Sequence, residues 1–384
     1  MRTLDCDLHG AQVLLPGEGL VSAGLSIADG RIASGTTGRA VDLTGFLVLP
    51  GIVDVHGDGF ERHLAPRRGA MKQMDQGLVA AEAELAANGI TTAVLAQFMS
   101  WEGGLRGVDF ATQMFDALAR TAPTLVTDLR AQLRMETHLV EVFATLPERL
   151  ADWGIDYVVF NDHLPHDRLA AGKTPRRMVG QALKAGRSPE AHLALMQRLH
   201  EARDAVPAAL DALCSRLGDA GLRMGSHDDQ TAAQRAAWRA RGVQVSEFPE
   251  TLEAAEAARD GGDTIVLGAP NVVRGGSHNG NVSALDLITM GLCDALASDY
   301  HYPSPRRAAL MLADSGVLAF EAAWHLISAG PARVLDLPDR GTLAEGQRAD
   351  IVILDAKSRR VAATLSGGVV SHMNGEIASR FTAG

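Results

Sequence analysis

Residues 49–58 read Leu49-Pro50-Gly51-Ile52-Val53-Asp54-Val55-His56-Gly57-Asp58, an apolar run that ends in a histidine and a carboxylate two residues apart. Side chains at positions i and i+2 of an extended segment point to the same side. If residues 49–55 form a strand, His56 and Asp58 can therefore reach one metal ion from its C-terminal end. The alternative is a buried strand followed by a Gly-rich turn, whose polar side chains only satisfy backbone groups.

Composition limits the classes of protein to consider. The chain has 384 residues and a formal net charge of −10, which disfavours binding to nucleic acid or to an anionic membrane by bulk attraction. The three cysteines, Cys6, Cys214 and Cys293, lie far apart, which suits a reducing cytoplasm. We see no signal peptide and no apolar stretch long enough for a membrane span. The sequence leaves homo-oligomerisation open.

The middle of the chain alternates predicted strands with predicted helices. Helical patterns cover residues 77–87, 110–120, 189–203, 231–241, 251–259 and 284–291. Strands are predicted at residues 49–55, 91–96, 131–135, 156–161, 221–226, 243–246, 264–267 and 295–298. This alternation predicts a parallel (β/α)₈ barrel of the TIM type over residues 49–345.

Both ends of the chain look all-β. Short apolar runs at residues 11–15, 24–28 and 31–33 surround the turn Asp29-Gly30, and similar runs occur at residues 351–354 and 368–371, before the turn Asn374-Gly375. We expect residues 1–48 and 346–384 to assemble one small β-sandwich. Two independent β appendages are the alternative, but each would be too small to bury a core by itself.

Several predicted strands end in a side chain that can bind a metal. In α/β barrels the chemistry gathers at the C-terminal ends of the strands. These side chains are His56, Asp58, Glu136, Asp162, His163, His227 and Asp299. Imidazole and carboxylate ligands without cysteine suit Zn²⁺, Mn²⁺ or Fe²⁺. No lysine falls at a predicted strand end, so Glu136 is the candidate for a carboxylate that bridges two metals.

The segment Pro50–His56, the split sandwich and the closing Ala349–Leu354 together resemble the amidohydrolase superfamily, although the usual His-x-His is His56-Gly57-Asp58 here. Further motifs resemble the PhnM family, the α-D-ribose 1-methylphosphonate 5-triphosphate diphosphatases of phosphonate catabolism. These motifs are residues 57–63, 134–138, 161–163, 226–229, 246–249 and 268–271.

That resemblance implies roles for the strand-end side chains. One metal, most simply zinc, would be held by His56, Asp58 and Asp299, and a second by His163 and His227, with Glu136 shared. Asp299 would also be the general base for an attacking water. In the superfamily, the histidines of the second metal usually lie at the ends of the fifth and sixth strands. His163 and His227 instead lie at the ends of the predicted fourth and fifth strands. Either the strand count is off by one, or Glu247 at the sixth strand takes part.

A ribose triphosphate substrate requires cations at the mouth of the barrel. The candidates in strand-end loops are Arg62, Arg67, Arg68, Lys173, Arg176, Arg177 and Arg274. Arginine offers a bidentate fork to phosphate, and lysine a point charge. The Gly-rich loop Gly275-Gly276-Ser277-His278 could present backbone N–H groups to phosphate oxygens.

The implied function is hydrolysis of α-D-ribose 1-methylphosphonate 5-triphosphate with release of pyrophosphate. One rival is another amidohydrolase that cleaves a C–N bond, such as a cyclic amidase, a deaminase or an N-acetyl sugar phosphate deacetylase, because the same metal centre serves an amide carbonyl. A second rival is a non-catalytic barrel that has lost its metals.

Overall fold

The computed structural model describes residues 2–65, 73–176, 178–276 and 281–382. The chain divides into two compact units. The first unit comprises Met1–Leu95, Thr121–Arg130 and Ile265–Gly384, and the second comprises Ala96–Arg120 and Ala131–Thr264. The finer division into a sandwich of residues 1–48 plus 346–384 and a barrel of residues 49–345 stays a prediction.

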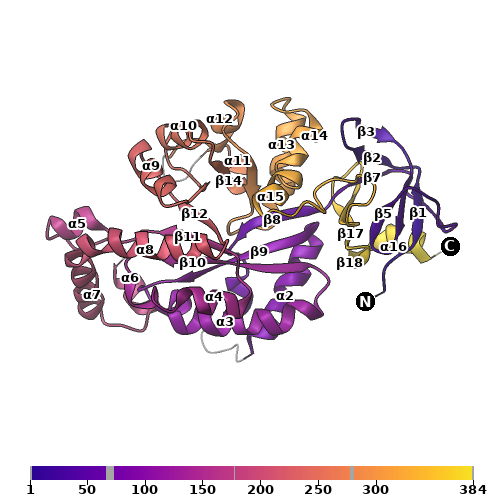
Figure 1. Ribbon diagram of the computed structural model, residues 1–384. Coiled ribbons are helices and arrows are strands. Elements are labelled where there is room, and N and C mark those ends of the chain that lie inside the picture. The colour runs from indigo at the N-terminus through magenta and orange to yellow at the C-terminus, as the bar shows by residue number, and fades with distance from the viewer. Residues whose placement is uncertain (1, 66–72, 177, 277–280, 383–384) are drawn as a thin grey trace. The chain divides into compact units, whose positions relative to one another are not determined.

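The first unit contains two sheets that form a sandwich, shown beside the labels β1 and β7 in Figure 1. One sheet has the order β5-β4-β1-β6, with β1 Cys6–His9, β4 Leu25–Ala28, β5 Arg31–Ala33 and β6 Ala40–Asp42. The other has the order β18-β17-β16-β7-β2-β3, with β2 Gln12–Leu15, β3 Gly19–Ser22, β7 Phe46–Pro50, β16 Ile351–Asp355, β17 Val361–Ser366 and β18 Val369–Met373. Strands from both ends of the chain share this sheet and one buried apolar core, as predicted.

The C-terminal end departs from the all-β prediction. The expected turn at Asn374-Gly375 instead leads into a helix, α16 Gly375–Thr382. Its Ile377 and Phe381 are buried in the sandwich core. Their i,i+4 spacing places both on one helix face. At the N-terminal end the Asp29-Gly30 hairpin is confirmed: both residues have positive φ, 50° and 75°, and they join β4 to β5.

The segment predicted to form one strand, residues 49–55, is divided between two strands. Residues up to Pro50 belong to β7, which pairs antiparallel with β16, and β8 Ile52–Gly57 pairs in parallel with β9 Ile90–Met99. Gly51 lies between them, where a Cβ atom would be 2.4 Å from Oγ1 of Thr91. The chain therefore changes sheet at a glycine because no side chain fits there.

The barrel strands form an eight-stranded sheet in sequence order, and each of the eight predicted strands has a counterpart in it, the first beginning only at Ile52. Besides β8 and β9 they are β10 Asp128–Glu136, β11 Tyr157–Asn161, β12 Arg223–His227, β13 Val245–Glu247, β14 Thr264–Gly268 and β15 Ala295–Ala297. Within the first unit, a parallel bridge between Gly57 and Asp299 joins the end of β8 to the segment after β15. The predicted (β/α)₈ barrel with a small sandwich is therefore correct.

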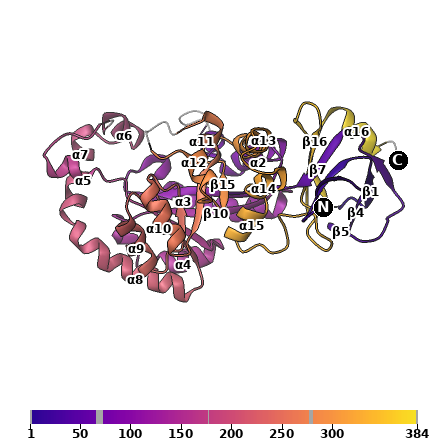
Figure 2. The same ribbon diagram turned by 90° about the horizontal axis from the view of Figure 1, so that it is seen from above.

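Helices separate the barrel strands. In the first unit these are α1 Glu61–Leu64, α2 Met74–Ala87, α11 Ala269–Arg274, α12 Ala284–Thr289, α13 Ser304–Asp314, α14 Phe320–His325 and α15 Ala329–Val334. In the second they are α3 Val108–Thr121, α4 Leu146–Trp153, α5 His166–Ala170, α6 Met178–Lys184, α7 Pro189–Glu201, α8 Val206–Asp219, α9 Ala232–Ala240 and α10 Leu252–Asp260. Figure 2 shows α5, α6 and α7 grouped together.

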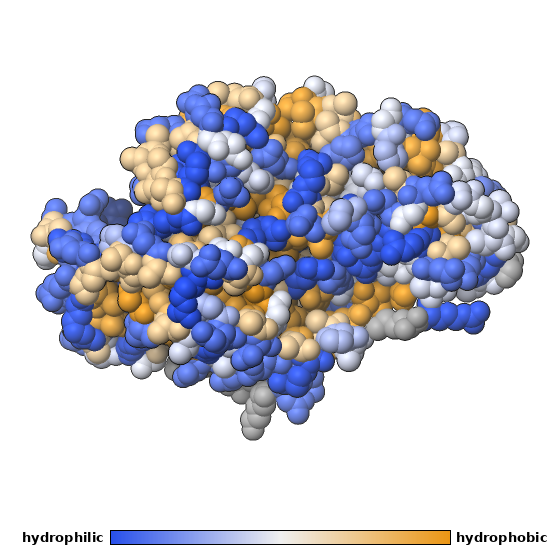
Figure 3. Space-filling view, viewed as in Figure 1, coloured by the Kyte–Doolittle hydropathy of each residue, from blue (hydrophilic) through white to orange (hydrophobic). Residues whose placement is uncertain are grey.

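The surface is that of an ordinary globular protein. Polar side chains cover most of the face drawn in Figure 3, with apolar side chains between them. Large exposed apolar side chains include Val79 on α2 and Met311 on α13, and Val179 and Leu183 lie together on α6. Among the described residues, we find no helix that combines the length and the apolar character needed to cross a bilayer.

One buried arginine organises β12 and β13. Arg235 on α9 is fully buried, and its guanidinium lies 3.0 Å from a carboxylate oxygen of Asp229 and 3.0 Å from one of Asp263. It also donates to Oγ of Ser226 on β12 and to the carbonyls of Val243 and Val245. A buried charge persists only where partners of this kind compensate its desolvation.

We expect Arg235→Met to lower the free energy of unfolding by about 3–5 kcal/mol, because it leaves the buried Asp229 carboxylate without its cation and Asp263 with Arg239 alone. The matched control is Arg241→Met, which removes an ion pair with the exposed Asp211 and should cost less than about 1 kcal/mol. Urea unfolding of both variants measures the difference. Equal stability of the two variants would show that Arg235 has no such role.

Candidate metal centre and substrate site

In the first unit, backbone pairing brings together the three residues expected to bind one metal. The amide of Asp299 donates to the carbonyl of His56 at 2.9 Å, and the amide of Asp58 donates to the carbonyl of Asp299 at 2.9 Å. Asp299 has φ 54°, a left-handed conformation that is uncommon outside glycine. The turn of the chain at Asp299 is thus held between the residues that flank Gly57.

A buried carboxylate supports this pairing. Asp54 on β8 accepts hydrogen bonds from the backbone N–H of Ser298 at 2.8 Å and from its hydroxyl at 2.5 Å. Burial raises the pKa of the Asp54 carboxyl, and the two bonds from Ser298 oppose that shift. Asp54 therefore ties β8 to the residue immediately before Asp299. Sequence reasoning included Asp54 only as part of an apolar run.

In the second unit, Glu136 and His163 form a close pair. Glu136 ends β10 and is fully buried, and its Oε1 contacts Nδ1 of His163 after β11. Its Oε2 accepts from the indole N–H of Trp101 at 3.2 Å. Burial lowers the pKa of the His163 ring while the Glu136 carboxylate raises it, and the net shift is upward. The two residues are thus placed to act on one cation or one proton.

Glu102 adds a further possible ligand to this pair. Its carboxylate, Glu136 and His163 each offer a ligand atom within 4.8 Å of the other two. Glu102 follows the end of β9 and pairs with Arg106 at 3.1 Å. Glu102 was not identified as a ligand from the sequence. It lies several residues beyond the end of the strand predicted at residues 91–96, so it was not counted as a strand-end side chain.

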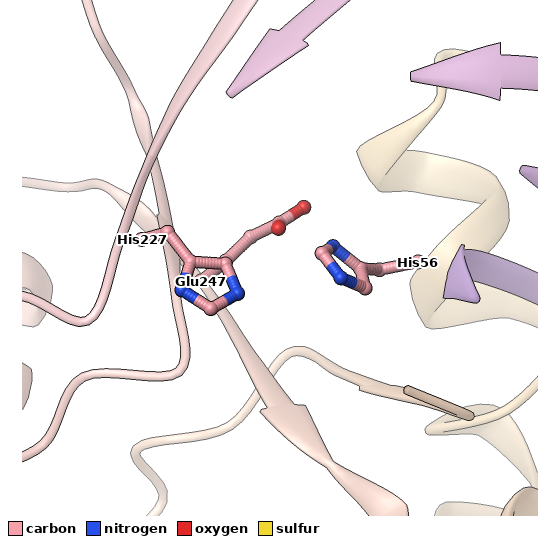
Figure 4. A group of neighbouring side chains, drawn as sticks. All are labelled: His56, His227 and Glu247. Atoms are coloured by element: carbon pink, nitrogen blue, oxygen red, sulfur yellow. The ribbon is translucent and has the colours of Figure 1, made fainter. Parts of the chain in front are cut away.

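His227 and Glu247 end the neighbouring strands β12 and β13, where each offers a ligand atom within 4.8 Å of the other (Figure 4). Nδ1 of His227 lies 2.9 Å from the Asp228 carboxylate, and its Nε2 lies 3.0 Å from the guanidinium of Arg134. A metal at His227 would therefore displace one of these contacts. A carboxylate on one ring nitrogen is a common arrangement for a histidine that binds metal through the other.

Glu247 is held in place by two buried donors. Its Oε1 accepts from the hydroxyl of Tyr157 at 2.6 Å and from the side-chain amide of Gln132 at 2.7 Å. Burial, followed by the Glu247 carboxylate, raises the pKa of Tyr157, so this hydroxyl stays protonated and donates. The strand count proves correct, with β11, β12 and β13 as the fourth, fifth and sixth strands. Participation of Glu247 in the metal site stays a prediction.

The arginine and lysine side chains predicted to bind phosphate differ in their contacts and exposure. Arg62 donates to the carbonyl of Tyr300 at 3.2 Å and also pairs with Glu84, which offsets its charge. The guanidinium of Arg274 lies 5.9 Å from the ring centre of Tyr300. Both arginines thus lie beside the residue that follows Asp299. Lys173 and Arg176 are exposed in the second unit.

The glycine loop differs from the expected phosphate cradle. Arg274 ends α11, and Gly275, with φ 74°, terminates that helix. The amides of Gly275 and Gly276 donate to the carbonyls of Val272 and Asn271. Both N–H groups are thus committed to the helix end, which is not the arrangement expected of amides that bind phosphate. Arg67, Arg68, Arg177, Ser277 and His278 lie outside the described residues.

The second unit also contains an open pocket of about 630 Å³. Asp162, His163, His227 and Asp228 line it, together with Trp238. Two of the expected metal ligands therefore face a space that can hold a small molecule.

Comparison with known proteins gives consistent results. Residues 278–371 match the model of the amidohydrolase family. The α-D-ribose 1-methylphosphonate 5-triphosphate diphosphatase of Escherichia coli is 32% identical over 374 residues, which cover 92% of this chain and 96% of that protein.

Solved structures share the fold at low identity. Molinate hydrolase has a TM-score of 0.65 at 14% identity, covering 99% of this chain and 96% of its own. A mutant N-acetyl-D-glucosamine-6-phosphate deacetylase from Mycobacterium smegmatis has a TM-score of 0.62 at 17% identity, covering 96% and 99%. The sequence match extends over nearly the whole chain, and the fold agrees with it. The chain therefore belongs to the amidohydrolase superfamily and, within it, to the PhnM family of its E. coli relative.

Proposed function

We propose that this hydrolase is a metal-dependent diphosphatase that releases pyrophosphate from α-D-ribose 1-methylphosphonate 5-triphosphate in phosphonate catabolism, in the cytoplasm. The observation that carries the proposal is 32% identity to a diphosphatase of that specificity along 92% of the chain. The metal-competent side chains at five barrel strand ends support it, because the chemistry of such barrels gathers there.

The donor set fits divalent cations. We propose that His56, Asp58 and Asp299 of the first unit hold one cation, that His163 and His227 of the second hold another, and that Glu136 is shared. Glu247 is the further candidate ligand beside His227 (Figure 4). Nitrogen and oxygen donors without sulfur suit Zn²⁺ as well as Mn²⁺ or Fe²⁺. Such cations polarise phosphoryl oxygens and activate water for attack near neutral pH.

The chain's own residues would perform the remaining steps. Asp299 would accept the proton of the water that attacks the α-phosphorus, since its backbone is fixed between His56 and Asp58. Arg274 and Arg62, both beside Tyr300, would stabilise the charge that develops on the departing pyrophosphate. Lys173 and Arg176, with Arg67, Arg68 and Arg177, are the remaining candidates for the polyphosphate.

The direct test is turnover of a substrate panel by metal-replete protein. We expect the ribose 5-triphosphate carrying a 1-methylphosphonate to yield pyrophosphate and no free phosphate, with both products measured separately. N-acetylglucosamine 6-phosphate should not turn over. Hydrolysis of this amide without pyrophosphate release would favour the C–N bond alternative. A protein that binds metal and hydrolyses neither substrate would favour a non-catalytic barrel.

A second prediction concerns the shared carboxylate. We expect Glu136→Gln to bind about one or two equivalents of metal fewer than the wild type, because a bridging carboxylate serves both cations of a two-metal site. Glu102→Gln, a change in the same cluster, should keep the wild-type metal content. Elemental analysis of reconstituted proteins measures both. Loss of metal only in Glu102→Gln would transfer the bridging role to Glu102.

A third prediction separates two roles of Asp299. Asp299→Asn should keep the fold, because Asn tolerates the left-handed conformation, and should lose activity by about 10²-fold or more, the scale of general-base catalysis. The control is Asp336→Asn, a change at another left-handed aspartate (φ 52°), which is exposed and lies in the same unit. Metal content and rate are measured on the same sample. A metal-depleted variant would make Asp299 chiefly a ligand, and near-normal turnover would exclude both roles.

A further inference from the structure

A second group of histidine and carboxylate side chains lies next to the Glu136–His163 pair and is not used by the proposed reaction. His138 follows β10, Asp162 follows β11 and His166 begins α5, all within the second unit. Nε2 of His166 lies 3.1 Å from Nε2 of His138 and 3.3 Å from Oδ2 of Asp162. Nε2 of His138 lies 3.5 Å from the same oxygen. The three atoms thus form a nearly equilateral triangle.

Hydrogen bonds alone do not explain this convergence. Each ring nitrogen has two neighbours that are separated by an angle of roughly 60°, whereas an N–H group prefers a nearly linear approach to a single acceptor. In a tetrahedral zinc site with bonds of about 2.0–2.1 Å, the ligand atoms lie about 3.3 Å apart. The observed separations of 3.1, 3.3 and 3.5 Å therefore match one face of such a tetrahedron.

A third histidine, His200, contacts this group. Nδ1 of His200, at the end of α7, lies 2.8 Å from Nδ1 of His166. If His166 donates through Nδ1, its Nε2 carries a lone pair directed at the triangle. Metal-binding histidines are commonly held in one tautomer by a hydrogen-bond partner on the second ring nitrogen.

We propose that His138, Asp162 and His166 form a separate binding site for a divalent transition-metal ion of the Zn²⁺ class. Asp162 and His163 are consecutive, but their side chains diverge: His163 pairs with Glu136, and Asp162 approaches His138 and His166. The His138 side chain is 4% exposed, that of His166 30% and that of Asp162 43%. The fourth coordination position is therefore open to water or to an anionic oxygen ligand from the pocket that Asp162 and His166 line.

The site is tested by metal titration of the full, metal-stripped chain with Co²⁺, followed by its visible absorption, and with Zn²⁺, followed by elemental analysis. We expect His166→Ala to bind about one equivalent fewer than the wild type, because three protein ligands are the usual minimum for an open zinc site. Asp167→Asn, a change at the next, exposed residue of α5, is the matched control and should bind as the wild type does. His200→Gln should keep the equivalent but bind it about 10- to 100-fold more weakly.

Asp162→Asn provides a second variant should His166→Ala fail to fold, which circular dichroism would show. The same number of equivalents bound with the same affinity in the wild type and in the folded variant would overturn the proposal, whatever the total. This outcome is distinct from failure of the diphosphatase function, which is measured by pyrophosphate release and by metal loss in Glu136→Gln. Loss of the equivalent with unchanged turnover would establish an ion site apart from the reaction.

Discussion

The buried guanidinium of Arg235 is the constraint on which the candidate centre of the second unit depends. Two carboxylates, Asp229 and Asp263, flank it, and Asp229 in turn accepts from the hydroxyls of Ser226 and Ser246. These serines directly precede His227 and Glu247. A shift in strand register would separate the buried Arg235 guanidinium from its carboxylate partners, which would cost roughly 3–5 kcal/mol. The ion network around Arg235 therefore fixes the register of β12 and β13, and with it the positions of His227 and Glu247 at their ends.

Three of the six described non-glycine residues with positive φ lie just after barrel strands. Asp228 follows β12 with φ 62°, Phe248 follows β13 with φ 55°, and Asp299 follows β15 closely with φ 54°. A left-handed conformation at a residue other than glycine costs on the order of 1–3 kcal/mol and persists only where the surroundings enforce it. Here the surroundings are pairings such as that of Asp299 with His56 and that of Asp228 with His227. The sharp turns let consecutive residues face different partners.

The two candidate metal groups of the second unit take their residues from the same two strand ends. Glu136 is the last residue of β10 and His138 lies two residues beyond it, and Asp162 and His163 both follow β11. One residue of each pair contributes to the Glu136–His163 contact, and the other to the triangle completed by His166. Two strand ends thus supply side chains to two neighbouring groups in the second unit.

The sequence by itself determined the eight barrel strands, the sandwich of both termini and the placement of His56, Glu136, His163, His227 and Asp299 at strand ends. Periodicity and chain order carry that information, because strand patterns and βαβ connections are local. Only the tertiary structure decided the change of sheet at Gly51, the pairing of Arg62 with Glu84 and the use of the Gly275 and Gly276 amides at a helix end. It alone brought His166 to His138, and His200 to His166. These contacts join segments far apart in the chain, and no local pattern encodes which distant side chain will satisfy a buried donor or neutralise a charge.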